Sequence, residues 1–305
     1  MIIDNDGRPA ERVGGDVGSL RCDRRASSAW GGLCALDVVT FSRGALAAAA
    51  VVVGLLGWMR IGFAESLSAE AAGRRLVAAY PEFLSAVENG QLVWKDGTRM
   101  TLDDGRRGKS FAALLDAPDL KDMFAWPYPA GAPASPPAFE IDPGRVRFQA
   151  LFDKMYGNCT KGETTGKLVE IIWLPKKARQ RLKVTRVNGV AQRLEAVSRE
   201  LDALPEKFNA YLFPAAGTYN CRTIAGTSRP SVHGAGIAID IALKHAHYWR
   251  WTKPAADGRH RFRNSIPPEI VSIFEAHGFI WGGRWYHFDT MHFEYRPELL
   301  TKGAN

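Results

Sequence analysis

The stretch Ser231-Val232-His233-Gly234-Ala235-Gly236-Ile237-Ala238-Ile239-Asp240 joins a histidine, two glycines and an alternating apolar run that ends on a carboxylate. Glycine permits tight turns and lets a metal or substrate approach the backbone. In the second half, strand alternation places Ile237 and Ile239 on one face and Asp240 on the other. We therefore expect Asp240 to lie at the end of a strand and to face a site.

A second segment, Asp289-Thr290-Met291-His292-Phe293-Glu294, places a carboxylate three residues before another histidine. Two imidazoles and one carboxylate form a suitable ligand set for catalytic zinc and leave one position for water. Zinc lowers the pKa of that water and polarises the carbonyl that is attacked. The two segments together predict a zinc site made by His233, Asp240 and His292.

Hydrolysis at such a site needs two further groups. A carboxylate must accept the proton of the water and hand it to the leaving amine, and Asp289 is the candidate. Strand alternation would point residues 289 and 292 to opposite faces, so a turn or bulge must lie between them. The tetrahedral oxyanion requires a fixed positive donor, for which Arg222 is the candidate and Arg229 its rival.

These motifs resemble those of the VanY-type D-alanyl-D-alanine carboxypeptidases, a family of zinc peptidases that also includes phage L-alanyl-D-glutamate endolysins. The resemblance rests on Ser-x-His-x6-Asp at 231–240, Trp-Gly-Gly-x-Trp at 281–285 and Asp-x-x-His-Phe-Glu at 289–294. It covers roughly residues 205–297. It implies a small α+β fold in which a mainly antiparallel sheet and surrounding helices form a zinc cleft.

The resemblance also implies a role for each matching residue. His233, Asp240 and His292 correspond to the zinc ligands, and Asp289 corresponds to the general base. Arg222 corresponds to the arginine that clamps the substrate carbonyl or carboxylate. The chain departs from the family pattern in its long N-terminal region and in the Cys221-Arg222 pair, which replaces the commoner Gly-Tyr-Arg-Ser.

Other residues near these motifs have two interpretations each. Ser231 could contact a substrate or stabilise a turn with its hydroxyl. His287 could line the cleft or be an ordinary surface residue, and Trp281 could form part of the core or a wall that binds substrate. Glu294 is predicted to be a partner of a metal ligand rather than a ligand itself. The remaining histidines have no partner at ligand spacing and are predicted surface residues: His245, His247, His260 and His277.

The formal charge of the 305-residue chain is +8, which favours an anionic partner. Nucleic acid, a membrane surface and an acidic wall polymer all fit that charge. No stretch combines dense lysine and arginine with stacking aromatics, which argues against nucleic acid. Together with the motifs, the charge predicts peptidoglycan or its stem peptides as the partner.

An apolar, uncharged run at 45–59 lies between Arg43 and Arg60. Its length suits the h-region of a signal peptide, and Gly62-Phe63-Ala64 offers a cleavage site after it. An uncleaved inner-membrane anchor and a buried core helix are the alternatives. We expect export to the periplasm or another extracytoplasmic compartment, where Cys159 and Cys221 should form a disulfide.

The chain divides by composition into four predicted parts: a leader at 1–64, a region of unknown role at 65–126, a proline-rich linker at 127–144 and a zinc peptidase domain at 145–305. Periodicity and turn signals predict the local elements. Helices are expected at Ala69–Ala79, Phe111–Leu115 and Val190–Leu204, strands at Leu168–Leu174 and Arg181–Val187, and a hairpin at Gln91–Leu102.

Three functions are compatible with this sequence. Hydrolysis of a stem peptide in the manner of a D-Ala-D-Ala carboxypeptidase is favoured. An L-Ala-D-Glu endopeptidase is the alternative, because the metal chemistry is the same and the loops around the pocket determine which bond is cleaved. A non-catalytic cell-wall-binding module is the third, and the intact ligand set with Asp289 argues against it. A purely structural zinc is disfavoured because the predicted ligands include no cysteine.

Overall fold

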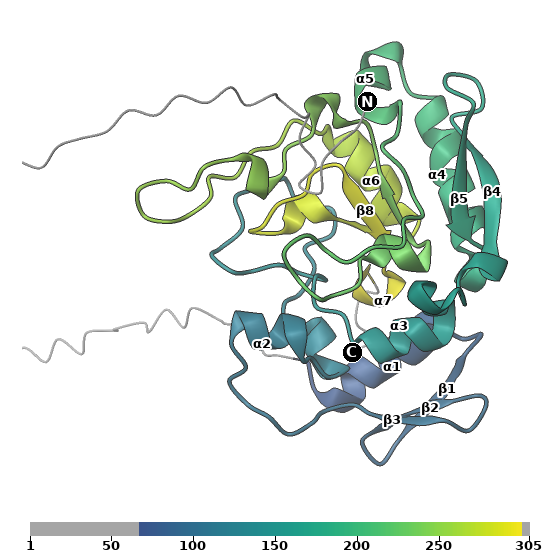
Figure 1. Ribbon diagram of the computed structural model, residues 1–305, viewed down its shortest axis with the longest axis vertical. Coiled ribbons are helices and arrows are strands. Elements are labelled where there is room, and N and C mark those ends of the chain that lie inside the picture. The colour runs from purple at the N-terminus through teal and green to yellow at the C-terminus, as the bar shows by residue number, and fades with distance from the viewer. Residues whose placement is uncertain (1–66, 301–305) are drawn as a thin grey trace, which may run out of the picture. The chain divides into compact units, whose positions relative to one another are not determined.

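The computed structural model describes residues 67–300, and the predicted α+β class is confirmed there (Figure 1). These residues belong to one compact unit, Phe63–Asn305. They form three small antiparallel sheets, in the orders β1-β2-β3, β4-β5 and β6-β8-β7. The apolar run at 45–59 and the cleavage site at 62–64 lie outside the described residues. Within 67–300, no helix combines the length and apolar character needed to span a membrane.

The N-terminal part of the unit is a helix packed on a three-stranded sheet. Helix α1 (Ala69–Ala79) begins after Ser68, whose hydroxyl accepts a hydrogen bond from the Ala71 amide, and it buries Leu76. The helix contacts β1 (Leu84–Glu88) and β2 (Gln91–Trp94), which pairs with β3 (Arg99–Thr101). A short helix, α2 (Phe111–Asp116), follows. The predicted helices and hairpin of this region are confirmed.

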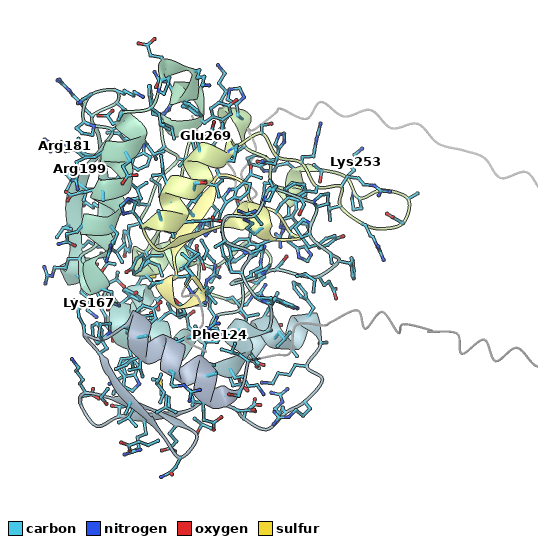
Figure 2. All side chains as sticks on the ribbon, turned by 180° about the vertical axis from the view of Figure 1, so that it is seen from behind. Phe124, Lys167, Arg181, Arg199, Lys253 and Glu269 are labelled. Carbon is cyan, nitrogen blue, oxygen red and sulfur yellow. A yellow bond between two sulfur atoms is a disulfide. The ribbon has the colours of Figure 1, made fainter. Side chains whose placement is uncertain are left out.

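A second layer consists of a two-stranded sheet and the longest helix of the described residues. Strands β4 (Leu168–Trp173) and β5 (Gln180–Thr185) pair antiparallel, and α4 (Val190–Asp202) lies along them (Figure 1). One face of α4 buries Leu194, Val197 and Leu201, as its spacing predicted. Arg181 and Arg199 extend outward from this layer (Figure 2).

The third sheet brings together the two motif segments. Strand β8 (His292–Tyr295) lies between β6 (Ala238–Asp240) and β7 (Phe279–Trp281). The β6–β8 register pairs Asp240 with His292. Helix α6 (Pro268–Ala276) covers the sheet and stacks Phe274 on Phe293 with ring centroids 3.8 Å apart. The remaining short helices are α3 (Gln149–Tyr156), α5 (Asn209–Leu212) and α7 (Pro297–Leu300).

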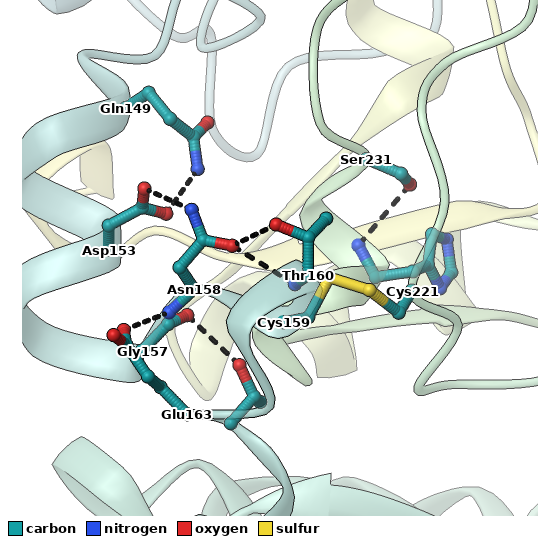
Figure 3. The surroundings of a disulfide bond; sticks show 11 residues. Gln149, Asp153, Gly157, Asn158, Cys159, Thr160, Glu163, Cys221 and Ser231 are labelled. Atoms are coloured by element: carbon teal, nitrogen blue, oxygen red, sulfur yellow. Dashed lines mark hydrogen bonds between the residues drawn. A yellow bond between two sulfur atoms is a disulfide. The ribbon is translucent and has the colours of Figure 1, made fainter.

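A disulfide between Cys159 and Cys221 connects the end of the α3 region to the loop before β6 (Figure 3). The predicted pairing is thus present. The turn that carries His233 packs directly on this bridge. A Cβ atom added to Gly234 would lie 2.7 Å from the Cys159 sulfur, so this close approach requires glycine.

We expect the unreduced, denatured full chain to titrate at most two thiols, those of Cys22 and Cys34, against four after reduction. Reduction of the folded chain should lower the free energy of unfolding by up to about 4 kcal/mol, because the bridge closes a loop with a sequence separation of 62. Titration with a thiol reagent in denaturant measures the first quantity. Four free thiols before reduction would contradict the bridge.

The segment 127–144, predicted as a linker, makes specific contacts with the C-terminal elements. The Tyr128 hydroxyl donates to Glu275 (2.7 Å) and accepts from the Trp281 amide (2.8 Å). The Trp285 indole N–H donates to the Pro143 carbonyl oxygen (2.7 Å). The segment therefore packs within the same unit as the regions on either side of it, and the assignment of separate roles to these regions stays a prediction.

Candidate metal centre

Three side-chain atoms converge at the β6–β8 pair. His292 Nδ1 lies 2.9 Å from Asp240 Oδ1 and 3.2 Å from His233 Nε2, and the last distance, from His233 Nε2 to Asp240 Oδ1, is 3.3 Å. A tetrahedral Zn²⁺ ion with bonds of about 2.0–2.2 Å would hold its ligand atoms roughly 3.4 Å apart. The three predicted ligands thus fit the first coordination sphere of one metal ion.

Local structure aims the His233 ring at this point. Ser231 precedes the 3-10 turn η6 (Val232–Ala235), and its hydroxyl accepts a hydrogen bond from the His233 amide (3.4 Å). The ring Nδ1 contacts the Thr218 carbonyl oxygen, which fixes the proton on Nδ1 and leaves the Nε2 lone pair for a metal. Ser231 is buried and stabilises the turn, which is one of its two predicted roles.

The His292 ring is held from its opposite nitrogen. Glu294 Oε2 lies 3.0 Å from His292 Nε2, so that Nδ1 faces Asp240 and His233. The Glu294 carboxylate is fully buried and also binds Arg147 and Arg296. Burial alone would raise its pKa, but Arg147, His292 and Arg296 hold the pKa of Glu294 well below its usual value. Glu294 therefore remains ionised and orients His292, the position predicted for a partner of a ligand.

The buried charges continue from Glu294 to the first helix. Arg296, which binds Glu294 with Nη1 (2.9 Å), also binds Glu298 with Nε. Glu298 in turn accepts a hydrogen bond from the Tyr80 hydroxyl at the end of α1 (2.6 Å). All of these side chains are fully buried. A continuous polar chain thus connects Tyr80 to the metal cluster.

The electrostatics of the cluster favour a cation. Burial by itself lowers the pKa of His292, but the hydrogen bonds that its ring donates to Asp240 and Glu294 raise it to about 10. Burial by itself raises the pKa of Asp240, but the charges and hydrogen bonds of His233 and His292 bring it below its usual value. The cluster therefore contains the ionised carboxylate of Asp240 and a protonated His292 ring. A metal ion that bound there would displace the proton from His292.

Asp289 occupies the turn before β8. Its amide donates to the Gly282 carbonyl oxygen (3.0 Å), and its own carbonyl oxygen accepts from the His292 amide (3.2 Å). The predicted turn between residues 289 and 292 is present. A Cβ atom on Gly282 would lie 2.5 Å from the Asp289 carbonyl oxygen, so the glycine of the Trp-Gly-Gly motif makes room for this turn.

The Asp289 carboxylate has the properties of a base. Burial raises its pKa first, and the charge of Asp240 adds to this, to a value of about 6. Its Oδ1 atom is buried without a hydrogen-bond partner among the described residues. A carboxylate with a pKa near neutrality can both accept and release a proton during one reaction cycle.

The arginine whose charge acts on the Asp289 carboxylate is one that the sequence motifs did not indicate. Arg145 donates to the His287 carbonyl oxygen (2.9 Å), lies over the Trp285 ring (5.1 Å), and its charge lowers the pKa of Asp289. The exposed Arg222 side chain instead donates to the Thr223 carbonyl oxygen (3.3 Å). The alternation Arg145-Val146-Arg147 could have indicated these residues in the sequence, because it places both arginines on one side of an extended segment.

The other two predicted substrate residues lie at different depths. The His287 ring bonds to Asp142 (2.9 Å), stacks on Phe111 (5.1 Å between centroids) and has a side chain that is 17% exposed. Trp281 is 1% exposed, and its indole N–H donates to the Thr290 carbonyl oxygen (2.9 Å). The structure therefore places Trp281 in the core beneath the Asp289 turn and His287 at the edge of the site.

We expect Glu294→Gln to weaken divalent-metal binding about 10- to 100-fold, because an uncharged amide no longer anchors His292 and leaves Arg147 and Arg296 without their shared carboxylate. Competition against a chromophoric chelator measures the affinity. Glu170→Gln is the matched control, because Glu170 is exposed and pairs with Arg181 on the β4–β5 sheet. Equal affinities for the two variants would contradict the orienting role.

Comparison with known families agrees with this geometry. A small α+β domain with a His-Asp-His cluster is the class that the fold and site define. Residues 225–295 match the family model described as D-alanyl-D-alanine carboxypeptidase, which is the VanY-like family that the sequence motifs resemble. The matched residues include the three predicted ligands and Asp289, whereas Arg145, Arg147 and Arg222 lie outside them. A comparison with curated proteins finds no match. The family match supports carboxypeptidase-like activity toward the cell wall in general.

Proposed function

We propose that the protein is a zinc-dependent peptidase that hydrolyses a bond in peptidoglycan stem peptides, in the manner of a D-Ala-D-Ala carboxypeptidase. The observation that carries the proposal is the convergence of His233 Nε2, Asp240 Oδ1 and His292 Nδ1 beside the buried carboxylate of Asp289. The family match over residues 225–295 supports the same class of reaction.

In this proposal each residue has one task. His233, Asp240 and His292 hold the zinc ion, which supplies Lewis acidity and lowers the pKa of a water. Asp289 accepts a proton from the attacking water and delivers it to the leaving amine. Arg145 supplies a fixed positive charge beside the reacting carbonyl, a task for which Arg222 was the sequence-based candidate.

The location of the protein is part of the proposal. A signal peptide or anchor at 1–64 would place the enzyme outside the cytoplasm, where its wall substrate lies. The Cys159–Cys221 disulfide supports this, because such bridges persist mainly in oxidising compartments.

Digestion of purified stem peptides by the zinc-loaded protein, followed by mass spectrometry of the products, tests the proposal. Release of terminal D-alanine is the expected result. Cleavage between L-Ala and D-Glu would instead identify the endopeptidase alternative. Binding to wall fragments without any cleaved product would contradict an enzyme and favour a wall-binding module.

A further inference from the structure

A strongly positive loop projects from the unit between β6 and α6. We call residues 249–263 the basic loop, and its sequence is Trp-Arg-Trp-Thr-Lys-Pro-Ala-Ala-Asp-Gly-Arg-His-Arg-Phe-Arg. It carries Lys253 well away from the sheets (Figures 1 and 2). Five basic residues and one acid, Asp257, give the loop a formal charge of +4, half of the +8 of the whole chain. Because the loop does combine dense cations with aromatic residues, nucleic acid is included as an alternative partner in the test.

Most of these cations have no acid beside them. Arg261 lies 3.5 Å from Asp257, and both of these side chains are exposed, by 76% and 46%. Lys253, Arg259 and Arg263 are also exposed, and no carboxylate among residues 67–300 lies within 4 Å of their charged groups. The positive charge of the loop is therefore available to an anion outside the protein.

Large apolar side chains are exposed beside the cations. Among the described residues only four large apolar side chains are exposed, and two of them are Trp251 in the loop (38%) and Phe139 (48%). Phe139 contacts the loop through Arg259, whose guanidinium lies 5.1 Å from the centre of its ring. Apolar surface in water is unfavourable, so the solubility that cations provide does not account for these two rings.

Hydrogen bonds hold both ends of the loop at the edge of the metal site. The Trp249 amide donates to the Phe288 carbonyl oxygen (2.9 Å), and the His260 amide donates to the Tyr286 hydroxyl (3.1 Å). The Trp249 and His260 rings also pack edge to face, 4.9 Å apart. Phe288 and Tyr286 lie one and three residues before Asp289. A surface that bound the projecting part of the loop would therefore be close to the metal site.

An anionic lipid surface matches both features of the loop. Lipid phosphates attract lysine and arginine, and the headgroup region favours tryptophan, whose ring is apolar and whose N–H is polar. A soluble anionic polymer would account for the cations alone. The exposed rings of Trp251 and Phe139 favour a partner that also offers an apolar phase, and a projecting loop can reach a flat surface.

We propose that the basic loop, together with Phe139, docks the protein on an anionic lipid bilayer, with Trp251 in the headgroup region. This contact is separate from the anchor predicted within 1–64, because it involves the described part of the chain. It is also independent of the zinc chemistry. The docked loop would hold the metal site beside the membrane surface.

Protection of the loop from trypsin in the full chain tests the proposal. The probes are vesicles of phosphatidylglycerol mixed with phosphatidylcholine, and vesicles of phosphatidylcholine alone. We expect the anionic vesicles to slow cleavage after Arg259, Arg261 and Arg263 by about tenfold or more, and the neutral vesicles to have little effect. Salt at 1 M should remove the protection, because it shortens the Debye length to about 3 Å. Mass spectrometry of the fragments reports on the loop itself, even where the apolar run at 45–59 also inserts.

A variant without three of the cations isolates their contribution. Lys253→Gln, Arg261→Gln and Arg263→Gln are combined, and Arg259 stays as the cleavage site and as the partner of the Phe139 ring. Each cation near an anionic surface contributes about fivefold in affinity, so the contact of the loop should weaken on the order of 100-fold. Protection at Arg259 should then be lost.

The matched control removes three charges from the β4–β5 and α4 layer: Arg181→Gln, Lys183→Gln and Arg199→Gln. These side chains are exposed, and Arg181 and Arg199 extend away from the unit (Figure 2), so the control should keep full protection. A second variant, Trp251→Ala, tests the apolar contact. Brominated lipids should quench the fluorescence of the wild-type protein more than that of this variant. Unchanged thermal midpoints would show that all variants are folded.

Several outcomes would overturn the docking. These are equal protection by neutral and anionic vesicles, protection that survives in the triple loop variant, and loss of protection in the control. Protection by single-stranded DNA or by wall fragments, without protection by anionic vesicles, would also overturn it and would identify a polymer as the partner. Equal quenching of the wild-type protein and Trp251→Ala would refute the insertion of Trp251.

Discussion

His233→Ala and His292→Ala should each abolish stoichiometric zinc and peptidase activity together. Each variant retains two of the three protein ligands, and a site with two ligands holds zinc poorly. The structure strengthens the expectation for His292, because the same ring also binds Asp240 on one side and Glu294 on the other. Its loss would leave the carboxylates of Asp240 and Glu294 without their shared partner.

Elemental analysis of the purified variants measures the metal, and peptide hydrolysis measures the activity. His247→Ala is the matched control, since its ring contacts Ser265 on an exposed loop (2.9 Å) and should have no effect on either quantity. One zinc per chain in both ligand variants would refute the ligand assignment.

Asp289→Asn should keep its zinc and lose turnover by a factor on the order of 10² to 10⁴, the usual contribution of a positioned base. The amide matches the carboxylate in shape, so the Gly282 contact and the turn before β8 should persist. KM should change little, because the lost interaction acts mainly in the transition state.

The pH dependence follows from the sign of the pKa shift. A base must be ionised, and burial with the neighbouring Asp240 charge raises the pKa of Asp289 to about 6. Activity of the wild-type protein should therefore fall as the pH drops through about 6, or somewhat lower where a bound cation stabilises the carboxylate. This acid limb should vanish in Asp289→Asn.

Each alternative result has a specific meaning. Loss of zinc from Asp289→Asn would make Asp289 a ligand and require Asp240 to be reassigned. Full activity with full zinc would place the base elsewhere. Glu294 and His287 would be the next candidates, although the structure engages Glu294 with two arginines and His287 with Asp142.

The sequence predicted the helices, strands and turns that local periodicity determines. The α4 stripe, the β4–β5 strands and the hairpin at 91–102 follow from spacing and turn residues, and the structure has them. The alternation that ends at Asp240 also decided which face this carboxylate occupies. The register that pairs it with His292 then brings both ligands together, although 52 positions separate them.

Contacts that depend on tertiary packing were not accessible in the same way. Arg147 and Glu294 are 147 positions apart, and no local sequence pattern predicts the contact between them. Likewise, the prolines of 127–144 exclude regular helix and strand but carry no information about where the Tyr128 hydroxyl bonds. A motif search therefore finds the ligands and misses the arginines that orient and surround them.

The buried path from Tyr80 through Glu298, Arg296 and Glu294 to His292 limits how this catalytic segment could be inherited. Recombination that transferred residues 225–295 to another protein would carry the ligands but leave behind Arg147, Arg296 and the first helix. Glu294 would then lack both of its arginines inside a desolvated core, and breaking one buried pair in this way costs about 3–5 kcal/mol. Selection would thus preserve the first helix and the C-terminal strand segment together. A transferred segment would need other residues that replace the arginines and the helix it left behind.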